Sequence, residues 1–115
     1  MLYNISYNFY SPHDPDEEFF ILLGSLGNYQ LGFDGFLFID TPYIASGIRE
    51  ELDNYFMNGK RGRYYICRVV KDSGGRFDNR TRRFISKYWP RVPEMDDLGK
   101  MPDTQQQEIW SSDEV

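Results

Sequence analysis

A two-residue turn signal at Asp34-Gly35 constrains the fold of this 115-residue chain more than any other feature. It divides the run NYQLGFDGFLFID, residues 28–40, into two halves rich in strand-forming residues. Asp-Gly suits the tight turn between antiparallel strands, because glycine tolerates the positive φ that such a turn needs. The sequence therefore predicts a β-hairpin over these residues.

A further strand is predicted at the start of the chain, in the stretch YNISYNFY, residues 3–10. Side chains along a strand point to alternate faces, so its apolar and aromatic residues separate from its polar ones. We expect the covered face to carry Tyr3, Ile5, Tyr7 and Phe9, and the open face to carry the polar row Asn4, Ser6 and Asn8.

Two helices are predicted, one before and one after the hairpin. The first has Asp14 as its N-cap and ends at Gly27. The second has Thr41 as its N-cap, followed by a proline, and ends at the pair Asn58-Gly59. In both segments apolar residues recur at helical spacing, so each helix has one face suited to cover a sheet.

The run RYYICRVV, residues 63–70, is predicted to be the last strand of the domain, with Cys67 in the core. The element order is then βαββαβ. This order predicts an α+β ferredoxin-like fold, with a four-stranded antiparallel sheet and two helices on one face. Two helices cover only one side of such a sheet, so the other side stays open unless a partner covers it.

The chain continues beyond this fold as a C-terminal extension. Residues 71–83 have the composition of polar turns, and residues 84–92 fit either a short helix or an added or exchanged strand. Residues 93–115 are predicted to be an acidic, flexible tail, with Ile109 and Trp110 as the hook if it docks. We therefore expect a domain over residues 1–92 and a tail over residues 93–115.

Composition excludes several classes of protein. Cys67 is the only cysteine and His13 the only histidine, so an intramolecular disulfide and a cysteine- or histidine-rich metal centre are excluded. No window approaches the roughly 18–20 apolar residues of a membrane helix, and no signal-peptide pattern begins the chain. We expect a cytoplasmic protein without a cofactor or a membrane partner, with His13 as a solvated loop residue.

Charge is partitioned along the chain, with net values of −8, +9 and −6 for residues 1–56, 57–91 and 92–115. The basic band either attracts a polyanion or neutralises acidic parts of the protein's own fold. Aromatic residues are interleaved with it, which favours a groove that tracks a nucleic-acid backbone and stacks bases. The candidate nucleic-acid-binding residues are Lys60, Arg61, Arg63, Arg76, Arg80, Arg82, Arg83 and Lys87.

The order and hydrophobic pattern of residues 1 to about 70, from ISYN in the first strand to YYICRVV in the last, resemble a known family. It is the small CRISPR-associated adaptation protein superfamily of ferredoxin-like fold, with its SinR-like and VapD-type ribonuclease relatives. The resemblance implies a homodimer with sheets packed face to face and a tie to nucleic acid. In its nuclease members the first strand ends in an aspartate near the dimer axis, where two copies share a divalent ion. The matching residue here is Asn8, whose neutral amide is a poor ligand for Mg²⁺.

We therefore expect a dimeric, nucleic-acid-associated or assembly module without metal-dependent catalysis, and we assign no catalytic or metal-binding residue. Two alternatives stay open. The first is a toxin-type endoribonuclease, in which basic residues act with His13 or a tyrosine. The second is a protein-binding module that acts through its acidic surfaces.

Overall fold

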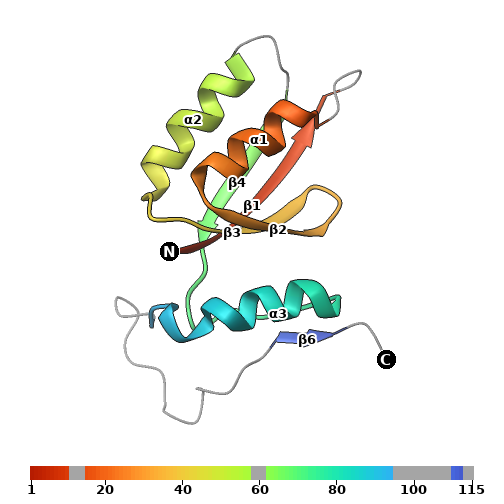
Figure 1. Cartoon of the computed structure of the whole chain (residues 1–115), viewed down its shortest axis with the longest axis vertical. Coiled ribbons are helices and arrows are strands. Elements are labelled where there is room, and N and C mark those ends of the chain that lie inside the picture. The colour runs from red at the N-terminus through yellow and green to blue at the C-terminus, as the bar shows by residue number, and fades with distance from the viewer. Residues whose placement is uncertain (11–14, 58–61, 95–109, 113–115) are drawn as a thin grey trace. The chain divides into compact units, whose positions relative to one another are not determined.

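The structure is a computed structural model that describes residues 1–10, 15–57, 62–94 and 110–112 (Figure 1). It has a mixed α+β architecture. The chain divides into two compact units, Met1–Arg68 and Val69–Val115. The predicted limits of a domain at 1–92 and a tail at 93–115 stay a prediction.

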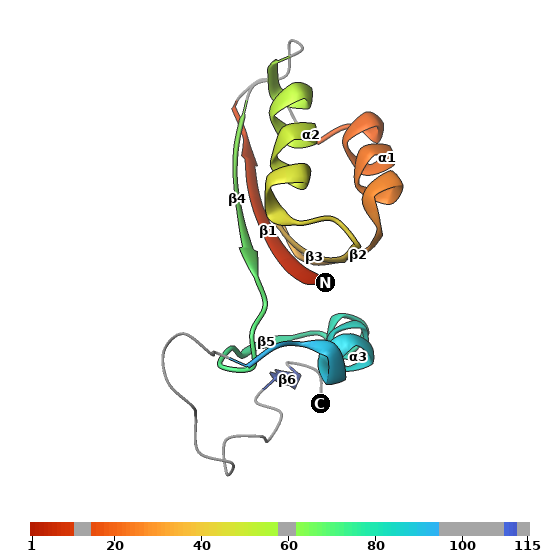
Figure 2. The ribbon, with the colours of Figure 1, turned by 90° about the vertical axis from the view of Figure 1, so that its left-hand side faces the viewer.

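The first unit contains a four-stranded antiparallel sheet in the order β2-β3-β1-β4. Helices α1 and α2 lie on the same side of this sheet, as Figure 2 shows. The predicted α+β class and the four-stranded antiparallel sheet are confirmed. The elements are β1 (Leu2–Phe9), α1 (Glu17–Leu26), β2 (Asn28–Phe33), β3 (Phe36–Asp40), α2 (Ala45–Met57) and β4 (Gly62–Arg68).

The alternation predicted for the first strand is present in β1. Tyr3 and Ile5 are buried in the core, and Tyr7 and Phe9 pack against it. Burying a large apolar side chain stabilises the fold by about 1.5–3 kcal/mol, so this row fixes which face of β1 meets the helices. The other buried residues of this core cluster are Phe19, Leu23 and Leu26 of α1, Leu37 and Ile39 of β3, and Ile48 and Leu52 of α2.

The predicted hairpin is also present, with its turn at Asp34-Gly35 between β2 and β3. Gly35 has φ 79°, in the left-handed region that favours glycine. A Cβ at this position would lie 2.8 Å from the carbonyl oxygen of Tyr7. The carbonyl oxygen of Gly35 accepts a hydrogen bond from the amide of Tyr7 at 2.8 Å, so the turn is tied to β1.

Helix α1 begins later than the sequence pattern predicts. Its N-cap is Asp16, whose Oδ1 accepts a hydrogen bond from the amide of Phe19 at 3.0 Å. Asp14, the predicted cap, lies outside the described residues. The helix ends at Gly27 as predicted, where the Gly27 amide donates to the carbonyl oxygen of Leu23 at 3.1 Å.

Helix α2 also begins later, at Ala45, so the prediction of Thr41 as its N-cap is wrong. Thr41 is buried, and its hydroxyl donates to the carbonyl oxygen of Leu26 at 2.7 Å while accepting from the amide of Tyr43 at 3.2 Å. The hydroxyl thus satisfies a carbonyl at the C-terminal end of α1, which is a different use of the same hydrogen-bonding group. Helix α2 ends at Met57, and the predicted stop at residues 58–59 lies outside the described ranges.

Strand β4 is confirmed, but the prediction that Cys67 lies in the core is wrong. Cys67 is exposed. In the register of β1 and β4, Cys67 lies opposite Asn4, whereas its neighbour Ile66 lies opposite the buried Ile5. The side chain of Cys67 therefore shares with the polar row the face of the sheet that α1 and α2 leave uncovered (Figure 2).

The second unit contains β5 (Gly75–Phe77), α3 (Asn79–Tyr88), the 3₁₀ helix η1 (Trp89–Arg91) and β6 (Trp110–Ser112). Strands β5 and β6 pair in parallel, and α3 lies against both. Residues 84–91 therefore belong to α3 and η1, so the helical alternative for residues 84–92 is confirmed. Residues 71–83, whose composition is turn-like, also contain β5 and the first residues of α3. Part of the predicted tail forms β6.

Candidate nucleic-acid interface

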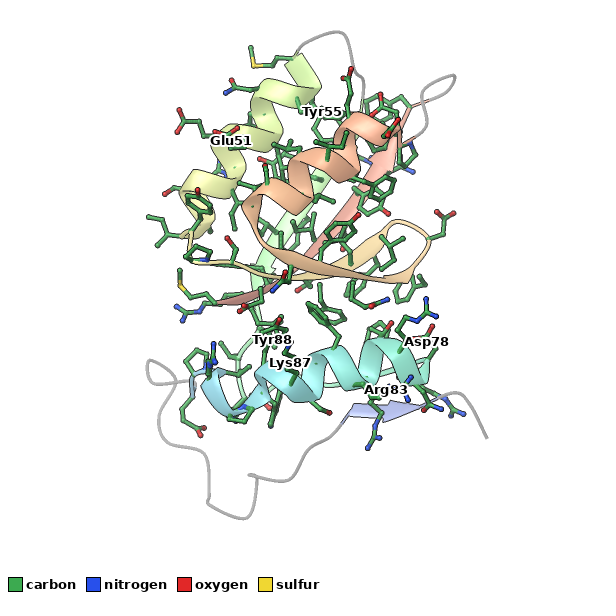
Figure 3. All side chains as sticks on the ribbon, viewed as in Figure 1. Glu51, Tyr55, Asp78, Arg83, Lys87 and Tyr88 are labelled. Atoms are coloured by element: carbon green, nitrogen blue, oxygen red, sulfur yellow. The ribbon has the colours of Figure 1, made fainter. Side chains whose placement is uncertain are left out.

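The predicted basic residues of the second unit gather mainly on α3. This helix begins at its N-cap Asp78, whose carboxylate accepts a hydrogen bond from the amide of Thr81 at 2.8 Å. Arg80, Arg83 and Lys87 are exposed and follow one another at i, i+3 and i+7, so they share one face of the helix. We call these three residues the α3 basic face; Figure 3 labels Arg83 and Lys87. The buried residues of α3 are Thr81, Ile85 and Tyr88.

Local helix stability accounts only in part for the α3 basic face. Arg80 and Arg83 lie in the first two turns, where a positive charge opposes the helix dipole. Hydrogen bonds from Thr81 are the main cause that lowers the pKa of the Asp78 carboxyl, and the charges of Arg80 and Arg83 lower it further. The two arginines therefore favour the ionised N-cap. Lys87, in the last turn, is the one member of the set whose charge the helix dipole favours.

The aromatic residues of this unit are largely occupied by packing. Phe77, Tyr88 and Trp89 are buried, and the ring of Phe84 meets that of Tyr88 edge-on at 5.0 Å. The ammonium of Lys87 lies 5.4 Å from the centroid of the Tyr88 ring. The second unit therefore offers positive charge to a ligand. The rings named here do not provide the base-stacking surface that the interleaved aromatic residues predict.

The structure does not bring all eight predicted residues into one site. Arg76 is exposed on β5, and Arg82 is exposed on α3 outside the α3 basic face. Arg63 is exposed on β4, in the first unit. Lys60 and Arg61 lie outside the described residues.

A second candidate surface lies on the uncovered side of the sheet. The register pairs Ser6 with Tyr65 and Asn8 with Arg63, so these four side chains share that side. A hollow of about 230 Å³ lies between β1 and β4, lined by Ser6, Tyr7, Asn8, Arg63, Tyr64 and Tyr65. We call it the β1–β4 hollow. Sequence reasoning missed Tyr65, although its place two residues after Arg63 in a strand was a signal that both face the same way.

The described residues near the end of β1 do not form a cluster of potential metal ligands. In the ranges that the structure describes, no group of three or more His, Cys, Asp or Glu side chains could hold a metal ion. Asp16 caps α1, Asp34 lies in the hairpin turn, and Oδ1 of Asp40 lies 3.4 Å from the α-amino group of Met1. His13 lies in a stretch that the structure leaves undescribed.

Comparison with models of protein families, with curated proteins and with solved structures finds no match for this chain. Across the described ranges, no helix combines the length and the apolar character needed to cross a membrane.

Proposed function

We propose that this protein is a homodimeric, nucleic-acid-associated module that contacts phosphates through the α3 basic face and has no metal-dependent catalysis. The observation that carries the proposal is the alignment of Arg80, Arg83 and Lys87 along one exposed side of a helix whose opposite side is buried. Arginine binds phosphate oxygens in a bidentate manner, and lysine adds a mobile point charge.

The architecture of the first unit supports a ferredoxin-like fold within this proposal. Its elements follow the order βαββαβ, and its strands lie in the order β2-β3-β1-β4. Membership in the CRISPR-associated adaptation superfamily is proposed on the pattern of residues 1 to about 70 alone. With Asn8 in place of the aspartate of its nuclease members, the proposed role is binding or assembly.

Contacts with phosphate release counterions from the nucleic acid, so affinity depends on salt. If each of the three side chains of the α3 basic face neutralises one phosphate of a duplex, these contacts contribute about −3 to the slope of log affinity against log salt concentration. Any further contact, including one by Arg76, would make the total slope steeper. The slope thus measures the number of contacts directly.

A triple variant tests this proposal. Arg80→Gln, Arg83→Gln and Lys87→Gln together remove three charges but keep residues that favour a helix. We expect the affinity for a DNA duplex at low salt to fall at least tenfold, and the salt slope to flatten by about three, measured by fluorescence anisotropy. Circular dichroism checks that α3 remains helical.

The matched control is Arg49→Gln, which removes an exposed arginine from α2 in the first unit. It should leave affinity and slope unchanged. If the triple variant binds the duplex as tightly as the wild type, the α3 basic face is not the binding surface. Sedimentation of the wild-type protein tests the homodimer separately, and a monomer at all concentrations would contradict that part.

A protein-binding role is the second candidate, because one observation favours it. The described part of the first unit carries most of its acidic side chains on α1 and α2, among them Glu50 and Glu51, which line a separate hollow of about 440 Å³ with Tyr43. A basic peptide is the ligand that such a surface attracts. Charge neutralisation by Glu50→Gln with Glu51→Gln would abolish capture of a basic peptide and leave duplex binding unchanged.

A further inference from the structure

The β1–β4 hollow combines side chains of four different chemical kinds in one small area. Tyr65 exposes 66% of its surface although it lies in a strand paired with β1. Asn8 and Arg63 are exposed and lie opposite each other in the register, and Ser6 lies opposite Tyr65. An aromatic ring, a guanidinium, an amide and a hydroxyl thus face solvent together.

Tyr65 is exposed because the preceding residue, Tyr64, points to the helix side of the sheet. The hydroxyl of Tyr64 donates a hydrogen bond to Oδ1 of Asp53 on α2 at 2.8 Å. This contact, together with Ile66 packed against the core, fixes which way β4 faces. Consecutive strand residues point to opposite sides, so Tyr65 is held away from the helices.

Charge separates between the two sides of the first unit. The acidic residues of α1 and α2 lie on the helix layer, which Figure 2 shows on the opposite side of the sheet. None of the six residues that line the β1–β4 hollow is acidic, and one is Arg63. The guanidinium carbon of Arg63 lies 5.9 Å from the centroid of the Tyr10 ring, so a second ring holds the cation near the hollow.

We propose that the β1–β4 hollow binds one unpaired nucleobase of a single-stranded nucleic acid, with its neighbouring phosphate on Arg63. The ring of Tyr65 provides the stacking surface. The Asn8 amide and the Ser6 hydroxyl supply donors and acceptors for the edge of the base. This inference rests on the proposed function for its class of ligand, and it adds a preference for single strands that the α3 basic face does not supply.

The size and chemistry of the hollow favour this occupant over a drug-sized molecule or a second copy of the chain, so the proposed homodimer would form through another surface. A volume of about 230 Å³ is below the range of about 300–1,000 Å³ typical of pockets for drug-sized ligands, but it suits one planar ring. The centre of a homodimer interface is typically depleted of charged residues. A duplex has its bases stacked inside, so it cannot use the Tyr65 ring in this way.

The test compares two ligands, a short fluorescent oligothymidylate and a DNA duplex, on variants of the full chain. Tyr65→Thr removes the ring but keeps a residue that favours strands. We expect it to lower the affinity for oligothymidylate about tenfold, as the loss of one base stack does, with duplex affinity unchanged. Tyr65→Phe keeps the ring and should restore binding to the single strand. Phe33→Thr, at another exposed aromatic residue in a strand of the same sheet, is the matched control and should change neither affinity.

The outcomes separate this inference from the proposed function. If Tyr65→Thr binds oligothymidylate like the wild type while the α3 triple variant loses the duplex, the hollow is not a base site and the α3 proposal stands. If Tyr65→Thr loses only the single strand while the triple variant binds the duplex normally, the hollow stands and the α3 proposal fails. If Tyr65→Thr converts a dimer into a monomer with unchanged affinity for oligothymidylate, a second copy occupies this face and the inference is overturned.

Discussion

The phenol of Tyr55 donates a hydrogen bond to Oδ1 of Asp16 at 2.7 Å, and the same oxygen accepts the amide of Phe19 at 3.0 Å. One carboxylate therefore both caps α1 and joins it to α2. Burial raises the pKa of the Tyr55 phenol, and the hydrogen bond to Asp16 raises it further. The Tyr55–Asp16 hydrogen bond thus joins the two helices that cover the sheet, and its contribution to the free energy of unfolding can be measured.

Removing the Tyr55 hydroxyl should weaken this link. Tyr55→Phe keeps the ring and its packing but loses the donor, so we expect the free energy of unfolding to fall by about 1 kcal/mol, measured by urea denaturation at neutral pH. Asp16→Asn is the control, because an asparagine oxygen can still accept from both donors and cap the helix. A Tyr55→Phe variant as stable as the wild type would show that the hydrogen bond adds nothing to stability.

The raised pKa of Tyr55 also predicts a dependence of stability on pH. The folded state favours the neutral phenol, so the contribution is complete below the unfolded pKa of about 10 and is lost as pH rises through the folded pKa. The wild type should therefore lose more stability than Tyr55→Phe between about pH 9 and about pH 11. The pKa values of Tyr7 and Tyr64 are raised as well, chiefly by burial. Both tyrosines are present in the wild type and in Tyr55→Phe, so their effects cancel in the comparison. Equal losses in the two proteins would contradict the prediction.

Two glycines at the end of α1 should respond to alanine in opposite directions. A Cβ on Gly27 would lie 2.1 Å from the carbonyl oxygen of Asp40, which is backbone and cannot swing away. Gly27→Ala should therefore lower the free energy of unfolding by about 1–3 kcal/mol. Gly24 is exposed within α1, and its Cβ would meet only Cε1 of Tyr29 at 3.9 Å. Gly24→Ala should stabilise the protein by about 0.5–1 kcal/mol. Thermal unfolding of both variants gives the comparison.

The exposed thiol of Cys67 reports on the uncovered face of the sheet. In the native protein it should react with a maleimide at a rate close to that of the urea-unfolded chain, because neither helix of the first unit covers it. Mass spectrometry after timed quenching measures the rate. If the uncovered faces of two copies pack together, labelling should slow as the protein concentration rises. A thiol that is protected at every concentration would mean that this face is closed within one chain.

The sequence predicts the parts of the fold whose signals are local. Asp34-Gly35 specifies its turn through two adjacent residues, and β1 shows its faces through strict alternation. The start of α1 is harder, because Asp14 and Asp16 both offer an oxygen ahead of the helix and only the three-dimensional arrangement with Tyr55 selects one. Thr41 was misread for a similar reason, since its hydroxyl bonds to Leu26, which is distant in sequence.

The candidate surfaces show the same limit. The α3 basic residues are evident in the sequence, but β5 and β6 are three residues each and more than thirty residues apart, too short for a periodic signal. Strand β4 has apolar or aromatic residues on both of its faces, so its pattern alone left the direction of Cys67 and Tyr65 ambiguous. The pairing of β4 with β1 decides it.

Tyr64 and Tyr65 are chemically identical neighbours that point to opposite sides of the sheet. Tyr64 hydrogen-bonds to α2, and Tyr65 faces solvent. Because the period of a strand is two, an inserted or deleted codon in β4 would exchange them and send Arg63 or Cys67 towards the core. Single substitutions can therefore change the chemistry of β4 one residue at a time. An insertion or deletion that keeps the two faces of the strand would have to comprise two residues.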